Sequence, residues 1–279
     1  MKSLHQLNSL IDLLSSLKTK PKKSLSQNFL VDKNIIDKFI KTLHLKKEDI
    51  VLEIGPGPGV ITSNLLKAQK IIAIEKDDTL AKNLKDLKHE NLDIKNIDFL
   101  NLDLNFLKNY NKKIKVISSI PYHLTKPIIF KLLNNHSLFS TIVLIIQKEV
   151  ANKIIAPINT KKYSSFSTIV NLYADIKIIS HISRNSFFPK PNVDSTIIEL
   201  KIKGSLQNTF ENDLEIKKFK EFILKSFKYR RKKLISNLKE VYPNKNLTEA
   251  FESLRIDLNI RAQSLTLDDF LILYKKLLM

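Results

Sequence analysis

Cysteine is absent from this sequence of 279 residues, which excludes disulfide bonds, thiolate metal sites and cysteine nucleophiles. Long apolar runs are also absent, since none approaches the roughly 18 residues that indicate a membrane span. Residues 1–26 lack the pattern of a signal peptide and are typical of a short amphipathic helix followed by a basic segment. The hydrophobic content of 43% is enough for a well-packed core. Because neither a membrane span nor a signal peptide is recognisable, we expect a soluble, cytoplasmic protein without a membrane partner.

Acidic residues are few relative to basic ones: 28 Asp and Glu stand against 47 Lys and Arg, for a formal net charge of +19. Such an excess favours a polyanionic partner, although the abundance of Lys, Asn and Ile also fits the coding bias of an AT-rich genome. The charge is concentrated between residues 217 and 239, where Glu221 is the one acid. The ten basic residues of this stretch are Lys217, Lys218, Lys220, Lys225, Lys228, Arg230, Arg231, Lys232, Lys233 and Lys239.

The basic stretch also carries apolar residues at helical spacing, namely Phe219, Ile223, Phe227, Leu234 and Leu238. The spacing predicts a helix with one face in a core and the other presenting charge. Only five arginines occur in the chain, and Arg230 and Arg231 are adjacent, which suits forked contacts to phosphate. We therefore expect phosphate contacts from Arg230, Arg231, Lys232 and Lys233. The alternative for one of the two arginines is that it faces the core of the helical domain.

Short apolar runs alternate with helical patterns over the first two thirds of the chain. Five runs read as strands with helical patterns between them, at 49–54, 70–75, 91–97, 113–120 and 140–147, and two more strands follow at 175–183 and 193–203. This order predicts an α/β fold with a doubly wound, mostly parallel seven-stranded sheet that ends in an antiparallel pair. From about residue 208 the pattern is helical only. We expect an extension at 1–20, a sheet domain at 21–205 and a helical domain at 206–279.

Glycine is scarce, yet three of its four occurrences fall in "EIGPGPGVIT", residues 53–62. Gly55, Gly57 and Gly59 follow the first predicted strand, where the backbone of such a sheet approaches its ligand and positive φ is useful. Glu75 ends the second predicted strand, where a carboxylate can accept both hydroxyls of a ribose. These features indicate a nucleoside-binding turn. The alternative is a tight turn beside a solvated strand end.

A second motif, Ser119-Ile120-Pro121-Tyr122, stands at the end of the fourth predicted strand. It resembles the motif of methyltransferases that modify exocyclic amino groups of bases. The nitrogen of an adenine amino group is a poor nucleophile, because its lone pair is delocalised into the ring. Acceptors at residue 119 and at the backbone carbonyl of residue 120 would favour the pyramidal nitrogen that attacks a sulfonium methyl. Pro121 fixes the turn, and Tyr122 offers a stacking face to an extruded base.

Nine segments occur in the order typical of the ribosomal RNA adenine dimethyltransferases, which the chain resembles from about residue 20 to 275. The resemblance implies a Rossmann-like, class I methyltransferase dependent on S-adenosyl-L-methionine. It is strongest to the bacterial small-subunit enzymes, which make N6,N6-dimethyladenosine at two adjacent adenines of a hairpin loop. The segments are "KSLSQNFLVDKNII" (23–36), "VLEIGPGPGVIT" (51–62), "IAIEKD" (72–77), "NIDFLNLDL" (96–104), "SIPYHLTKPIIF" (119–130), "IIQKEVANKI" (145–154), "KKYSSFS" (161–167), "FFPKPNVDS" (187–195) and "FKYRRKKLISNL" (227–238).

The family pattern implies roles for individual positions. Cofactor contacts are implied for Asn28, Leu30, Gly55, Gly57, Glu75, Asp98 and Ser119, with Glu75 on the ribose and Asp98 on the adenine amino group. Phe187 would stack on the target base opposite Tyr122, whereas Phe188 reads as a packing residue. A structural role is the alternative for each position: Asp98 could cap a helix, and Phe187 could belong to the core.

The resemblance implies catalysis without a metal ion, by a monomer that acts on small-subunit rRNA within a pre-ribosomal particle. Three positions depart from the family pattern: Ser26 stands where Gly is usual, Ser119 where Asn is usual, and Gln263 where Glu is usual. Ser119 touches the chemistry itself. Two alternatives therefore stay open: a relative that methylates large-subunit rRNA or serves in transcription, and a non-catalytic RNA-binding assembly factor on the same fold.

Overall fold

The computed structural model describes residues 4–204 and 206–278. The chain divides into two compact units, one made of residues 1–151 and 176–202 and the other of residues 152–175 and 203–279. The second unit is therefore discontinuous in sequence, because a segment from the middle of the chain packs with the C-terminal helices. As functional divisions, the expected domain limits of 21–205 and 206–279 stay a prediction.

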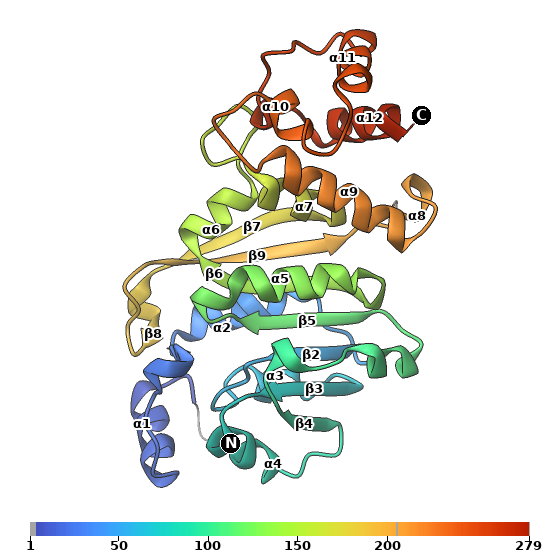
Figure 1. Ribbon diagram of the computed structural model, residues 1–279. Helices are drawn as coiled ribbons and strands as arrows, with labels where there is room; N and C mark the ends of the chain where they lie inside the picture. The colour runs from blue at the N-terminus through green and yellow to red at the C-terminus, as the bar shows by residue number, and fades with distance from the viewer. Residues whose placement is uncertain (1–3, 205, 279) are drawn as a thin grey trace. The chain divides into compact units, whose positions relative to one another are not determined.

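The first unit is built on a seven-stranded sheet with the strand order β4-β3-β2-β5-β6-β9-β7 (Figure 1). Neighbouring strands from β4 to β6 are parallel, and β9 runs antiparallel to β6. The predicted α/β class with a mostly parallel sheet is confirmed. The strands are β2 (Ile50–Ile54), β3 (Lys70–Glu75), β4 (Leu92–Asn96), β5 (Ile114–Ser119), β6 (Phe139–Gln147), β7 (Ala174–Ile182) and β9 (Ser195–Ile202).

Helices lie on both faces of this sheet, with α5 on the viewer's side in Figure 1 and α2 behind it. Before the sheet the chain forms α1 (Leu7–Ser16) and the two-residue strand β1 (Phe29–Leu30). β1 pairs with β8 (Phe187–Phe188) as a separate antiparallel ribbon that the sequence patterns do not predict. The remaining helices are α2 (Lys33–Thr42), α3 (Thr62–Leu65), α4 (Asp78–Lys85), α5 (Thr125–Asn134) and α6 (Lys148–Ile154).

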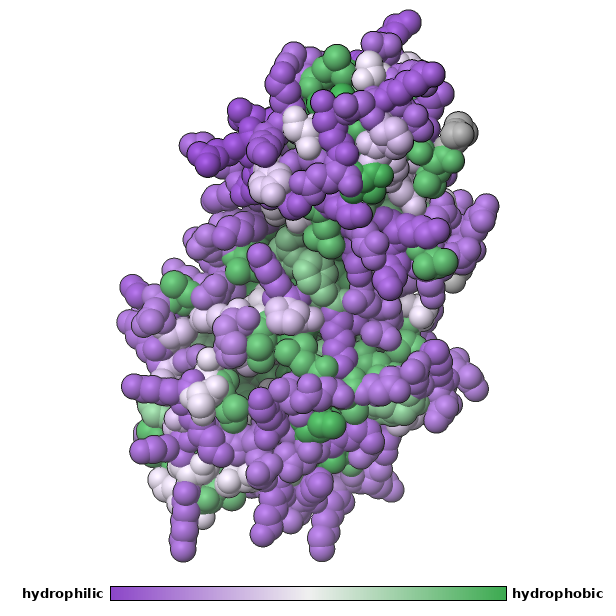
Figure 2. All heavy atoms as spheres, viewed as in Figure 1, coloured by the Kyte–Doolittle hydropathy of each residue, from purple (hydrophilic) through white to green (hydrophobic). Residues whose placement is uncertain are grey.

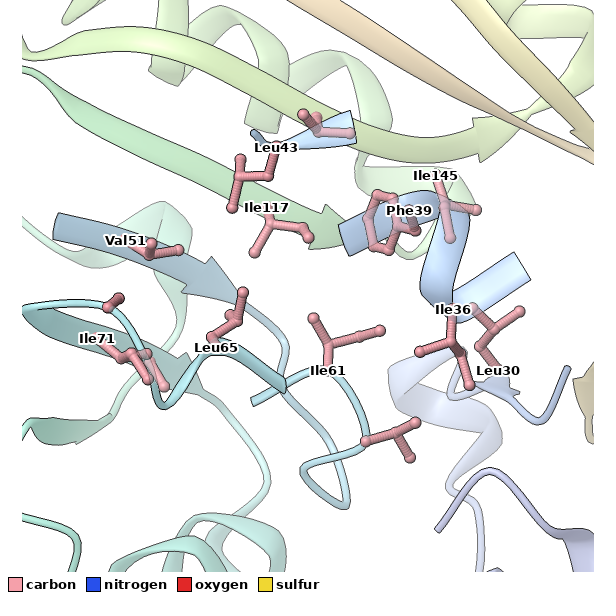
Figure 3. Close-up of a cluster of buried hydrophobic side chains, with 14 of the residues drawn as sticks. Leu30, Ile36, Phe39, Leu43, Val51, Ile61, Leu65, Ile71, Ile117 and Ile145 are labelled. Atoms are coloured by element: carbon pink, nitrogen blue, oxygen red, sulfur yellow. The ribbon is translucent and has the colours of Figure 1, made fainter. Parts of the chain in front are cut away.

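The main core forms where the apolar side of α2 meets one face of the sheet (Figure 3). Asp32 caps this helix by accepting a hydrogen bond from the Ile35 N–H, so that Ile36, Phe39 and Leu43 follow at helical spacing toward the sheet. Alternate residues along the strands meet them. These sheet residues are all buried: Val51, Ile71, Ala73, Ile117, Val143, Ile145 and Ile197.

The second unit is helical, but its basic stretch 217–239 is not the single helix that the spacing predicts. α9 (Asp213–Ser226) ends within it and α10 (Leu234–Leu238) begins after an interruption. The buried Asn237 side chain hydrogen-bonds the end of α9 at this break: its Nδ2 donates to the carbonyl of Ser226 and its Oδ1 accepts from the Tyr229 N–H. The other helices of this unit are α7 (Ser165–Tyr173), α8 (Leu206–Thr209), α11 (Asn244–Ser253) and α12 (Leu267–Leu278).

Hydrophilic residues predominate on the face shown in Figure 2, and hydrophobic residues lie in groups between them. The five apolar residues of the basic stretch are buried, as their spacing predicts. Within residues 4–204 and 206–278 no helix combines the length and the apolar character that crossing a membrane requires.

A buried acid stands in β2, two positions before Gly55 of the glycine-rich turn. Glu53 in β2 is 2% exposed, and its Oε2 has no hydrogen-bond partner among the described residues. Burial raises the pKa of Glu53 to about 8, and the negative charge of the nearby Glu75 adds to the rise. Glu53 is therefore protonated in the folded protein at neutral pH.

We expect Glu53→Gln to stabilise the fold increasingly as the pH rises from 4.5 toward 8. The folded pKa lies above the ordinary value of 4.5, so the unfolded chain releases this proton first and wild-type stability falls across that window. The free energy of unfolding, measured in urea at several pH values, should diverge between wild type and variant above pH 4.5. The same change at the exposed Glu90 is the control. Parallel curves for wild type and Glu53→Gln would contradict the assignment.

Candidate functional site

A cavity of about 180 Å³ opens at the carboxyl ends of β2, β3 and β5. Its wall also includes residues 24–30, which precede the sheet, and Phe187 of β8. The cavity brings together all the positions of the first unit to which a site role was assigned from sequence. They are Asn28, Leu30, Gly55, Gly57, Glu75, Asp98, Ser119, Ile120, Pro121, Tyr122 and Phe187.

The glycine-rich turn needs glycine for two different physical reasons. Gly55 and Gly57 adopt φ values of +69° and +58°, which L side chains rarely adopt. A Cβ on Gly57 would also lie 3.1 Å from Cε1 of the Phe29 ring, whereas a Cβ on Gly55 would meet nothing within 4 Å. The turn is thus packed against protein at Gly57 and open toward the cavity at Gly55.

Glu75 is a buried strand end, 6% exposed, so the alternative of a solvated one is wrong. Its Oε2 accepts a hydrogen bond of 2.9 Å from the Gly57 N–H, and its Oε1 accepts one of 2.8 Å from the Asp77 N–H. Burial raises the pKa of Glu75, while these two backbone donors oppose the rise. The carboxylate therefore fixes the turn and keeps further lone pairs that can accept from a ligand.

Asp98 follows β4 at the other side of the cavity and caps the 3-10 helix Phe99–Asn101. Its Oδ1 accepts from the Leu100 N–H and its Oδ2 from Lys76 Nζ, each at 2.9 Å. Burial alone would raise the pKa of Asp98, but these hydrogen bonds outweigh it and the pKa is lowered. Asp98 thus does cap a helix, which was the alternative to a cofactor contact. Its lowered pKa keeps an ionised carboxylate in the cavity wall.

Lys131 of α5 also supports the site, although no sequence pattern predicts it. Its Nζ donates to the carbonyls of Leu100 and Leu102 and lies 5.3 Å from the centre of the Phe99 ring, which fixes the turn that carries Asp98. No local signal identifies it, because it stands 33 positions after Asp98 in sequence.

The Ser119–Tyr122 motif turns the chain out of β5 and into the cavity wall. The Ser118 hydroxyl donates to the Ile54 carbonyl, and the Ile120 N–H donates to the Ile145 carbonyl, so both flanks of Ser119 are anchored to neighbouring strands. The hydroxyl oxygens of Tyr122 and Ser195 are 2.6 Å apart and share a hydrogen bond. Burial raises the pKa of Tyr122, which keeps its hydroxyl protonated.

Phe187 is 5% exposed and belongs to the main core, yet it also lines the cavity. Phe187 pairs with Leu30 across the ribbon of β1 and β8. The pairing holds a residue predicted to stack on the target base next to a residue predicted to contact the cofactor. Phe188 is partly buried in a different cluster, as a packing residue.

The N-terminal segment is tied to the strand ends by contacts that the sequence did not reveal. Gln27 Nε2 donates to Asp77 Oδ2 at 2.8 Å, and Lys22 Nζ lies 3.0 Å from the same oxygen. Ser26 adopts a φ of +50°, in the left-handed region that favours glycine, and its hydroxyl lies 3.2 Å from Nδ1 of His123. The one sequence signal is Asp77 itself, an N-cap residue two positions after a predicted strand.

In the second unit, Arg231, Lys232 and Lys233 are exposed, and Lys232 Nζ lies 4.4 Å from the centre of the Tyr229 ring. Arg230 differs from them, because its Nη2 donates to the carbonyls of Lys161 and Tyr163. Gln263, the third departure from the family pattern, accepts the Asn159 N–H through its backbone carbonyl, a contact that does not depend on the side chain.

Comparison with known proteins places the chain among the enzymes that act on ribosomal RNA. Residues 18–278 match the family model described as ribosomal RNA adenine dimethylase. The chain is 39% identical to ribosomal RNA small subunit methyltransferase A of Mycoplasma mobile, over 92% of this chain and 98% of that protein. It is 38% identical to the protein of the same name from Francisella tularensis subsp. novicida, over 91% of this chain and 96% of that one.

Two solved structures resemble the whole fold. A dimethyladenosine transferase from Plasmodium falciparum aligns with a TM-score of 0.77 at 28% identity, over 89% of this chain and 98% of that one. The 23S rRNA methyltransferase ErmE aligns with a TM-score of 0.67 at 23% identity, over 90% of this chain and 100% of that one, a likeness of fold alone.

Proposed function

Because the chain belongs to the ribosomal RNA adenine dimethylase family, we propose that it methylates two adjacent adenosines of a small-subunit rRNA hairpin loop at N6. S-adenosyl-L-methionine is the methyl donor and N6,N6-dimethyladenosine is the product. The observation that carries the proposal is one cavity that joins the glycine-rich turn and Glu75 to the Ser119–Tyr122 motif and Phe187. A nucleoside-binding site and a base-binding site thus share a wall.

The cofactor half of the cavity fits S-adenosyl-L-methionine. The open space at Gly55 leaves room for a ligand against the backbone, and Glu75 offers acceptors to ribose hydroxyls. Asp98 is an acceptor for an adenine amino group, while Asn28 and Leu30 close the cavity from the N-terminal segment. When bound, this cofactor supplies a methyl group on a positively charged sulfur.

The target half of the cavity fits an extruded adenine. Tyr122 and Phe187 offer ring faces, and base stacking on an aromatic side chain contributes about 1–3 kcal/mol. The Ser119 hydroxyl and the Ile120 carbonyl accept from the amino hydrogens and favour a pyramidal nitrogen. Transfer is an in-line displacement, so orientation of the amine supplies most of the acceleration, and water takes the proton that the amine releases.

The exposed cluster Arg231, Lys232 and Lys233 docks structured RNA by neutralising phosphates. Arg230 is also exposed, and its two carbonyl contacts hold it in place next to Arg231. The protein works as a cytoplasmic monomer on a pre-ribosomal particle, with residues 21–205 as the methyltransferase part and residues 206–279 as the RNA-docking part.

Labelled methyl transfer tests the function directly. Small-subunit particles that lack the modification, large-subunit RNA and an unrelated RNA are incubated with protein and labelled donor, and nucleosides are identified by mass spectrometry. We expect N6,N6-dimethyladenosine at two adjacent positions in the small-subunit RNA alone. Transfer confined to large-subunit RNA would favour the other enzyme class, and RNA binding without transfer would favour an assembly factor.

We expect Ser119→Ala to slow methyl transfer by roughly 1–2 kcal/mol of barrier, the scale of one lost hydrogen bond. Ser119→Asn should hold or raise the rate, because the longer amide still offers an acceptor, and the Ile120 carbonyl survives both changes. Single-turnover rates at saturating cofactor separate this step from binding. A silent Ser119→Ala together with an inactive Ser119→Asn would show that the side chain only fills space.

Reversing the charges of Arg231, Lys232 and Lys233 to Glu should weaken RNA binding and flatten its salt dependence. Each lost phosphate contact removes about 0.7–0.9 from the slope of log K against log salt concentration. Arg230 is left intact because it stabilises its own unit. The matched control reverses the exposed Lys245, Lys275 and Lys276, and cofactor affinity should stay unchanged in both variants. An unaltered slope in the first variant would move the RNA site elsewhere.

A further inference from the structure

The two residue pairs of the ribbon formed by β1 and β8 belong to different apolar clusters. Leu30 and Phe187 are cross-strand partners, and both line the cavity and join the main core. Phe29 and Phe188 are the next pair and belong to a second apolar cluster, and Phe29 also reaches the cavity wall. Side chains alternate across a strand, so the two pairs lie on opposite faces of the ribbon.

Helix α1 covers the second face of this ribbon. Leu10 and Leu14 stand one turn apart and are 0% and 4% exposed. They cluster with Phe29 and with Leu80 of α4, and Phe188 packs against the same group. Figure 1 shows α1 at the same end of the unit as β8. The helix therefore lies behind the two strands that carry Leu30 and Phe187.

The contact continues from Phe29 into the glycine-rich turn. A Cβ added to Gly57 would lie 3.1 Å and 3.3 Å from two carbons of the Phe29 ring, so the ring packs directly on the turn. The next link is the hydrogen bond from the Gly57 N–H to Glu75. An unbroken chain of contacts thus runs from the buried side of α1 to the carboxylate assigned to the ribose.

The segment between α1 and β1 is fastened at the same place. Asp77 caps α4, accepts a hydrogen bond from Gln27 and pairs with Lys22, and its side chain is 1% exposed. Gln27 closes the loop on itself, since its Oε1 accepts the Lys22 N–H at 2.8 Å. This segment holds α1 close to the cavity.

Helix α1 has only loose packing against the turn itself. A cavity of about 260 Å³ lies between the helix and the turn, lined by Leu13 and Asp12 on one side and by Pro58 and Gly59 on the other. The close packing between α1 and the site therefore runs through the ribbon, where Phe29 contacts both.

We propose that α1 is a positioning element for both halves of the site: by packing Leu10 and Leu14 on the ribbon, it holds Phe29 against Gly57 and keeps Leu30 and Phe187 in the cavity wall. The proposal rests on the proposed function, because it assigns α1 to the affinity for an S-adenosyl ligand. It gives α1 a role within the protein.

The test compares Leu10→Ala/Leu14→Ala with two controls. Leu7→Ala/Ile11→Ala removes similar volume from the flank of the same helix, where the side chains are 42% and 40% exposed. Ile114→Ala removes a fully buried side chain from the amino end of β5, opposite the end that carries Ser119. Calorimetry with S-adenosylhomocysteine gives the affinity, and thermal unfolding gives the stability of each variant.

We expect the Leu10/Leu14 variant to bind S-adenosylhomocysteine about tenfold more weakly, and its KM for the methyl donor to rise more than its kcat falls. Ile114→Ala should lower the melting temperature without this loss, and the flank variant should match wild type. Leu14→Ala alone should shift affinity in the same direction, which keeps the test decisive if the double variant does not fold.

Affinities of Leu14→Ala and of a folded double variant within about twofold of wild type would overturn the positioning role of α1. A wild-type protein that binds no S-adenosylhomocysteine would overturn the proposed function together with this inference. The two failures are therefore distinguishable.

Discussion

The site depends on one buried carboxylate that accepts two backbone N–H groups. Glu75 joins the end of β3 to Gly57 in the turn after β2 and to Asp77 at the start of α4. Few side chains other than a carboxylate could serve two backbone donors while keeping lone pairs for a ligand. The cost is electrostatic, because Glu75 lies near the buried Glu53 and two negative charges there would repel each other. Protonation of Glu53 relieves that repulsion. Glu53 is then neutral, and Glu75 accepts the hydrogen bonds that fix the turn.

Much of this arrangement was predictable from sequence, for physical reasons that are local. Most of the parallel strands are short apolar runs, and a parallel sheet places its carboxyl strand ends at one edge, so the glycine-rich turn, Glu75 and Ser119 had to meet there. The family resemblance added Asn28, Leu30, Asp98 and Phe187, and all four line the cavity. Their contacts with a ligand stay predictions, because a cavity wall identifies neighbours and not partners.

The features that escaped prediction are long-range or very short. The ribbon of β1 and β8 joins residues about 160 positions apart through two pairs, too few to leave a period-2 pattern. The 217–239 stretch keeps helical spacing across its break, because Leu234 and Leu238 return to the same core after the interruption. At the break the side chain of Asn237 hydrogen-bonds Ser226 and Tyr229, and a single asparagine gives no such signal in sequence.

The discontinuous second unit imposes an order on folding during synthesis. α7 packs against α9 and α12, and Tyr163 lies with its ring centre 6.0 Å from that of Phe227. Phe166, Ile169 and Val170 are buried in this unit, yet the helices that cover them are translated later. The nascent chain must therefore carry an uncovered apolar helix until α9 and α12 leave the ribosome. During that interval α7 is open to aggregation, because exposed apolar surface on a partly made chain is prone to aggregate.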